Sequence, residues 1–123
     1  MNINFKELKN NNKQEIKYSN GKYIGQVING IREGKGIFYL NDDDRYEAEW
    51  KNDKKDGKGI YYYNKETWKG DRYEGDNKND KREGKGIYYY NNGDRRMGDY
   101  YNGEPIGKHV TLTKNGEVKV NNY

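Results

Sequence analysis

The feature that most constrains the fold is a short motif that recurs through almost the whole chain. Gly-Lys-Gly-Ile followed by two aromatic residues begins at Gly34, Gly57 and Gly84, and a degenerate copy begins at Gly107. A second element starts 11 positions before each copy, at Tyr23, Tyr46, Tyr73 and Arg96. Successive copies are 23 residues apart, except for a spacing of 27 between the second and third, where four extra residues fall around Lys65–Trp68. Periods of this length are typical of repeat proteins, in which each unit contacts mainly its neighbours.

Each copy predicts a β-hairpin. In the Gly-Lys-Gly element Gly86, Tyr88 and Tyr90 alternate with other residues and therefore share one face of a strand. Glycine at the matched position of every repeat indicates that an aromatic ring from the paired strand covers the vacant site, an arrangement known as aromatic rescue. Asn, Asp and Gly between the elements supply turns. The sequence thus predicts an all-β fold, an elongated antiparallel sheet or solenoid of tandem hairpins.

The same pattern predicts the organisation of the chain. We expect residues 1–15 to be a disordered or short N-terminal segment, residues 16–120 to form a single array, and residues 121–123 to be a tail. Within the array the repeats are predicted at about 23–45, 46–72, 73–95 and 96–118, with capping half-repeats at both ends.

The residue types exclude most catalytic chemistry. The chain has no cysteine, one histidine (His109) and one serine (Ser19), so disulfides, thiolate metal sites and most activated nucleophiles are ruled out. The Gly-Lys-Gly motifs lack the spacing of a phosphate-binding loop, and Asn41–Asp44 lacks that of a calcium loop and is expected to be a solvated turn. His109 is expected at the surface or in a strand. No apolar run approaches the roughly 20 residues of a membrane span, and no signal-peptide stretch is seen. We expect a cytoplasmic, non-enzymatic protein without a cofactor or metal.

The repeat closely resembles the MORN repeat (membrane occupation and recognition nexus). The likeness is carried by Tyr73–Asp94 and extends over about residues 16–120. Four positions depart from the pattern, Ala48, Asn77, Arg96 and His109, and predict weaker packing toward the C-terminal end. The resemblance implies a groove-bearing sheet used for binding, as in scaffolds at membranes, the cell cortex, cilia and flagella, some of which self-associate. It therefore implies a scaffold or adaptor in a cytoskeletal, ciliary or cortical assembly.

One face of the predicted sheet carries the candidate protein-binding residues. If the glycine face is the core, the intervening isoleucines and tyrosines point away from it. These candidates are Ile37, Tyr39, Ile60, Tyr62, Ile87 and Tyr89, together with Trp68 from the four-residue insertion. Two alternatives remain: the N-terminal segment could cover this face through Ile3, Phe5 and Leu8, and Trp68 could fold back over the sheet.

Repeated basic residues suggest a second kind of partner. Equivalent cations stack into columns, which could bind anionic phospholipid headgroups. The candidates are Arg32, Lys55 and Arg82 in one column and Lys35, Lys58 and Lys85 in another. A matching acidic column, Glu33, Asp56 and Glu83, cancels much of this field, so a charge-paired solvated face is the alternative. The net charge is only +4 and the acids are evenly mixed with the bases, which argues against nucleic acid as a partner.

Overall fold

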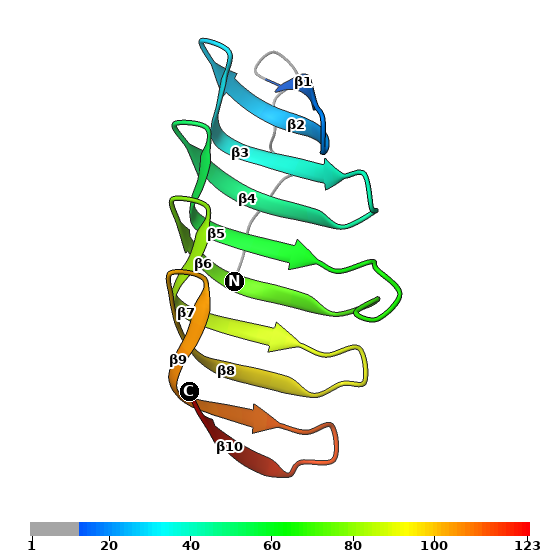
Figure 1. Ribbon diagram of the computed structural model, residues 1–123, viewed down its shortest axis with the longest axis vertical. Helices are drawn as coiled ribbons and strands as arrows, with labels where there is room; N and C mark the ends of the chain where they lie inside the picture. The colour runs from blue at the N-terminus through cyan, green and yellow to red at the C-terminus, as the bar shows by residue number, and fades with distance from the viewer. Residues whose placement is uncertain (1–12) are drawn as a thin grey trace.

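The computed structural model describes residues 13–123 as one antiparallel sheet whose ten strands follow each other in chain order (Figure 1). This confirms the predicted all-β array of tandem hairpins. The strands are β1 (Lys13–Tyr18), β2 (Gly21–Ile28), β3 (Ile31–Leu40), β4 (Arg45–Lys51), β5 (Lys54–Tyr62), β6 (Arg72–Lys78), β7 (Lys81–Tyr89), β8 (Arg95–Tyr101), β9 (Glu104–Leu112) and β10 (Val118–Asn122). Across the described residues no helix is long and apolar enough to cross a membrane.

The sheet extends slightly further than the sequence predicts. Strand β1 starts at Lys13 and β10 ends at Asn122, so residues 13–15 and 121–122 belong to the sheet instead of lying outside the array. The remainder of the expected N-terminal segment, including Ile3, Phe5 and Leu8, lies outside the described residues.

At one end of the sheet, a two-residue turn connects the two strands of each repeat. The turn residues are Asn29-Gly30, Asn52-Asp53, Asn79-Asp80 and Asn102-Gly103, and both residues of every pair have positive φ. This is the type I′ pattern, which suits Asn, Asp and Gly because these residues enter the left-handed region at low cost. The opposite end carries longer loops, and the longest, residues 63–71, contains the four-residue insertion.

A bulge bends the tip of each of these hairpins. The pairing register shifts just after Gly25, Ala48, Gly75 and Met97, and the facing strand carries a glycine with positive φ at Gly34, Gly57, Gly84 and Gly107. The extra residue on one strand curls the ribbon, as seen where the hairpins bend over in Figure 1. The tips fold toward the face that carries Tyr23, Phe38 and Tyr61. We call this the inner face and the opposite one the outer face.

The core is a thin layer of rings on the inner face. It rests on a row of small residues that crosses the sheet, Gly25, Gly36, Ala48, Gly59, Gly75, Gly86 and Gly98. The ring of Tyr23 lies over Gly36, and that of Tyr73 lies over Gly86, so closely that a Cβ at either glycine would collide with it. The predicted aromatic rescue is therefore present in the first and third repeats.

The fourth repeat fills the same space from the other strand. Arg96 replaces the tyrosine that would cover Gly98, and His109, which replaces a glycine, lays its own ring over Gly98. His109 is a strand residue but is fully buried, and its Nε2 lies 2.9 Å from the carbonyl oxygen of Asp99. Tyr100 beside it is also buried. His109 thus restores a ring over Gly98, but Nε of Arg96 and Nδ1 of His109 are buried without a hydrogen-bond partner among the described residues, and the buried core cluster lies in the first two repeats. The expectation of weaker packing toward the C-terminal end therefore stays a prediction.

Candidate interaction surfaces

The outer face carries a row of aromatic and basic side chains that alternate from strand to strand. Cross-strand pairing places Lys22, Tyr39, Arg45, Tyr62, Arg72, Tyr89 and Arg95 side by side, and we call them the Tyr–Arg row. The guanidinium carbon of Arg45 lies 4.0 Å from the centre of the Tyr62 ring, and that of Arg72 lies 3.8 Å from the centre of the Tyr89 ring. Each ring is thus covered on one side by a cation from the neighbouring strand.

A second row on this face alternates isoleucine with acid. It consists of Ile24, Ile37, Glu47, Ile60, Glu74, Ile87 and Met97. Glu47 lies 3.7 Å from Arg45, and Glu74 lies 3.1 Å from Arg72, so the acids hold the same guanidinium groups that cover the rings. The candidate Ile and Tyr pairs therefore share one face, and a charged strand separates each pair from the next. Ile60 is buried, with 8% of its surface exposed.

The lysine column on the outer face is interleaved with acids. Lys35 pairs with Glu49, Lys58 with Asp76 and Lys85 with Asp99 in the cross-strand register. Opposite charges placed directly across two strands attract each other, which favours a balanced local field over a continuous cationic stripe.

The other basic column lies on the inner face, at the bent tips. Nε of Arg32 is 2.7 Å from Oδ1 of Asp53 in the next turn, and Arg82 donates two hydrogen bonds to the carbonyl oxygen of Gly103. Burial of Asp53 opposes its ionisation, but the hydrogen bonds from Arg32 outweigh this and hold its pKa below the ordinary value. Nζ of Lys55 lies 4.2 Å from the centre of the Tyr46 ring, and burial lowers the pKa of this lysine.

The two basic columns consequently do not form one surface. Arg32, Lys55 and Arg82 join each hairpin tip to the next and pack on rings, whereas Lys35, Lys58 and Lys85 lie on the outer face. Sequence spacing alone could have assigned the two columns to opposite faces, because residues three positions apart in a strand point to opposite faces.

A column of aspartates, which sequence reasoning missed, links each loop to the following one. Oδ1 of Asp44 accepts a hydrogen bond from the Asn64 amide at 2.6 Å, and Oδ2 accepts one from the Tyr61 hydroxyl at 2.9 Å. Asp71 makes the same two contacts one repeat later, with Asn91 and Tyr88. Asp94 accepts from the amide of Lys114. The recurrence of Asp two positions before Tyr46, Tyr73 and Arg96 was the available clue.

The expectation that Asn41–Asp44 is a solvated turn is therefore wrong for one of its residues. Asp44 is only 2% exposed and serves as an acceptor for the next repeat. Within residues 13–123 no group of three His, Cys, Asp or Glu side chains is placed to hold a metal ion.

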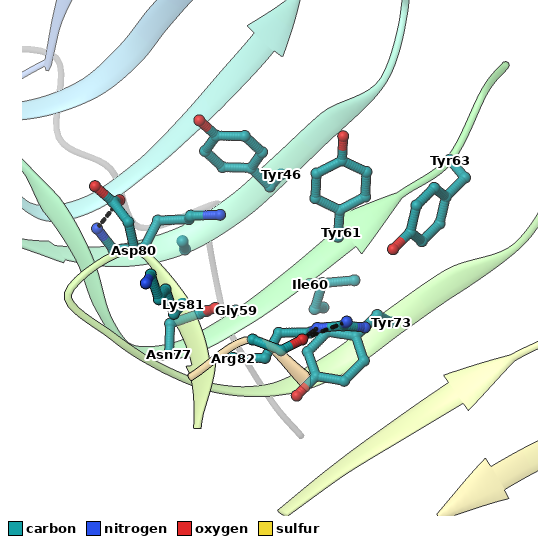
Figure 2. A pocket seen from close by; sticks show the side chains of 13 residues that line it. Tyr46, Gly59, Ile60, Tyr61, Tyr63, Tyr73, Asn77, Asp80, Lys81 and Arg82 are labelled. Atoms are coloured by element: carbon teal, nitrogen blue, oxygen red, sulfur yellow. Dashed lines mark hydrogen bonds between the residues drawn. The ribbon is translucent and has the colours of Figure 1, made fainter. Parts of the chain in front are cut away.

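The inner face is hollowed between the second and third repeats (Figure 2). The half-open cavity has a volume of about 370 Å³. It is lined by Tyr46, Ala48, Lys55, Gly59, Ile60, Tyr61, Tyr63, Tyr73, Asn77, Asp80, Lys81, Arg82 and Gly103. Two departures from the repeat create it. Asn77 stands where the neighbouring repeats have Trp50 and Tyr100, and Tyr46 stacks between Phe38 and Tyr61 instead of covering Gly59.

The inserted loop presents a single aromatic side chain to solvent. Trp68 is 52% exposed and belongs to the turn between β5 and β6, where its amide donates to the carbonyl of Lys65. With half of its surface exposed, this side chain is not buried against the sheet.

The geometry of the repeats agrees with a comparison against protein families. The MORN repeat model matches residues 23–45, 46–68 and 73–95, together more than half of the chain, while the fourth hairpin lies outside the matched stretches. No curated protein matches the chain. MORN repeats are non-enzymatic modules that mediate interactions with proteins or membranes. On its repeat sequence and its sheet of tandem hairpins, this chain belongs to the MORN-repeat family.

Proposed function

We propose that the protein is a non-enzymatic scaffold or adaptor that docks other proteins on its outer face within a cytoskeletal, ciliary or cortical assembly. The observation that carries this proposal is the Tyr–Arg row. Tyrosine and arginine are enriched among the residues that contribute most to binding at protein interfaces. Here each of Tyr62 and Tyr89 is already held against a guanidinium, so little side-chain freedom is lost on binding.

Repetition strengthens such a surface. Tyr39, Tyr62 and Tyr89 occupy equivalent places on alternate strands, and Ile37, Ile60 and Ile87 lie in the adjacent row. A partner that is itself elongated or repetitive would meet the same contact several times, and linked contacts raise the overall affinity without any new chemistry. Trp68 adds an exposed aromatic at the edge of the sheet.

The arrangement of the polar residues supports a binding role without catalysis. Ser19 lies in the turn between β1 and β2, whereas His109 is buried in β9, with seven strands between them. Neither is placed to activate the other.

Retention in detergent-extracted cells tests the proposal. A tagged copy should remain in the detergent-insoluble cytoskeletal pellet, and the triple variant Tyr39→Ser, Tyr62→Ser, Tyr89→Ser should be released, because it removes all three rings of the row. Circular dichroism should show an unchanged β spectrum for the variant. Tyr101→Ser is the matched control, since Tyr101 is exposed but lies outside the row, and this variant should stay in the pellet.

Two results would contradict the scaffold. The triple variant could be retained like the unmodified chain, or the chain could leave a membrane fraction on addition of salt alone. Salt-sensitive membrane binding that is lost on combining Lys35→Glu, Lys58→Glu and Lys85→Glu would support the alternative, a peripheral module bound to anionic phospholipids at ~1 kcal/mol per basic side chain.

A further inference from the structure

The residues that line the inner-face cavity match those that surround Trp50 one repeat earlier in the chain. The indole Nε1 of Trp50 in β4 donates a 3.1 Å hydrogen bond to the carbonyl oxygen of Gly36, a member of the small-residue row. The Trp50 ring contacts Tyr23 edge-on, with centroids 5.3 Å apart, and Tyr46 at 5.6 Å. Phe38 and the guanidinium of Arg32 complete its surroundings.

The repeat places an equivalent of each of these groups around the cavity. Tyr46, Tyr61 and Tyr73 correspond to Tyr23, Phe38 and Tyr46, while Lys55 corresponds to Arg32 and Gly59 to Gly36. All five line the cavity (Figure 2). The ring is missing, because Asn77 occupies the position of Trp50. The amide of Asn77 reaches over Gly59 but is too short to fill the space between the tyrosines.

The charges at the rim restrict what can enter. Lys55, Lys81 and Arg82 line the cavity, and they outnumber the one acid there, Asp80. Asp80 is itself engaged, because its Oδ1 accepts a hydrogen bond from the Lys55 amide at 2.8 Å. Among the described residues no ion pair is formed by any of these three cations. An acidic segment is therefore attracted to the rim and a basic one is repelled.

We propose that this cavity binds a tryptophan side chain of a partner protein, flanked in the partner by acidic residues. The ring would lie between Tyr46, Tyr61 and Tyr73, and the indole N–H would donate to the carbonyl oxygen of Gly59. The acids beside it would meet Lys55, Lys81 and Arg82. The site is on the face opposite to the Tyr–Arg row, so it is a second binding site and does not depend on that row.

The test uses a fluorescent short peptide with one tryptophan between glutamates. Fluorescence anisotropy should show saturable binding to the full chain. Replacing the tryptophan of the peptide by alanine, or its glutamates by lysines, should weaken binding at least about tenfold. Asn77→Trp should also weaken it at least about tenfold, because the new indole occupies the site. Asn77→Ala should keep binding, since the cavity stays open.

The thermal stability of Asn77→Trp shows whether the new indole fills the cavity or disrupts the fold around it. If the cavity has the shape of an indole site, Asn77→Trp should raise Tm by about 4 °C or more, because it buries a ring in the existing space. A fall in Tm would overturn the proposal, and so would equal binding of the peptide by Asn77→Trp and the unmodified chain.

Two further variants locate the binding. Tyr62→Ser on the outer face should leave peptide affinity unchanged, so loss of outer-face docking and loss of this site are measured separately. Self-association of the chain that is abolished by both Trp68→Ala and Asn77→Trp would place the Trp68 of a second copy in the cavity, and would overturn an acidic partner as its occupant.

Discussion

At the scale of single residues, equivalent glycines have different neighbours. Gly36 and Gly59 hold the same position in β3 and β5, and each lies in the small-residue row of the inner face. The ring of Tyr23 lies directly over Gly36, whereas Gly59 is covered by the end of the Asn77 side chain. The Tyr23 ring is packed among other rings and cannot move aside. The Asn77 amide borders the cavity and can move into it.

This difference predicts unequal costs for the same substitution. Gly36→Ala should lower the free energy of unfolding by about 1–3 kcal/mol, because the added methyl displaces Tyr23. Gly59→Ala should cost about 1 kcal/mol or less, because Asn77 can rotate into the adjacent cavity. Urea titration of both variants measures the difference. Equal costs would show that the ring does not constrain Gly36.

The covered glycines could be predicted from the sequence, but the cavity could not. Matched glycine positions indicate that a ring lies over them, and Tyr23 and Tyr73 do so. Asn77 and Ala48 are also visible as departures from the repeat. What the sequence does not show is the direction of the Tyr46 ring, which stacks 5.2 Å from Phe38 and leaves Gly59 without a ring over it. That choice depends on packing across three repeats.

At the scale of strands and turns, side-chain carboxylates connect neighbouring hairpins. Asp44, Asp71 and Asp94 each accept a hydrogen bond from a backbone amide in the next loop, and the first two also accept one from a tyrosine. At the other end of the sheet Glu33 accepts from the amide of Asn52. Both ends of a hairpin are thus tied to the next one by more than the strand pairing.

Burial should decide how much each aspartate contributes. Asp44→Ala leaves the Tyr61 hydroxyl and the Asn64 amide without their acceptor in a buried place, which should cost about 1–3 kcal/mol in free energy of unfolding. Asp94→Ala should cost about 1 kcal/mol or less, because the bond to Lys114 is exposed and water can replace it. Thermal unfolding of the two variants checks this order, and a reversed order would contradict it.

The hairpins themselves follow from the sequence, whereas their curvature does not. The 23-residue spacing and the Asn-Gly and Asn-Asp pairs predict strands and tight turns. The bulges that bend the tips depend on the pairing register between two strands, which the residue pattern leaves open. Strand alternation is enough to place Arg32, Lys55 and Arg82 on the glycine face, but their contact with the inner rings depends on the bend of the tips.

At the scale of the whole molecule, the core depends on neutral tyrosines. Burial raises the pKa of Tyr46 to about 12, and burial likewise raises the pKa values of Tyr23, Tyr61 and Tyr73. These hydroxyls bind their protons more tightly in the folded chain than in the unfolded one. Their contribution to stability is complete below the unfolded value of 10 and declines as the pH rises above it.

Alkaline unfolding should therefore be cooperative. Between pH 10 and 12 the unfolded chain loses phenolic protons that the folded chain keeps, so the free energy of unfolding should fall steadily as the pH rises through this window. Tyrosinate absorbance and circular dichroism should change together as the chain unfolds. Complete ionisation of the tyrosines near pH 10 with the sheet intact would contradict buried neutral rings.

The agreement between strand order and chain order has a mechanical consequence. Because each strand pairs only with the strands before and after it among the described residues, a load that pulls the two ends apart along the long axis acts on one pairing at a time. The edge strand peels away, the next becomes the edge, and the resistance at each step is that of a single ladder and its aspartate link. A load along the strands would shear whole ladders at once. As part of a larger assembly, the molecule would give way gradually under one direction of stress and hold firmly under the other.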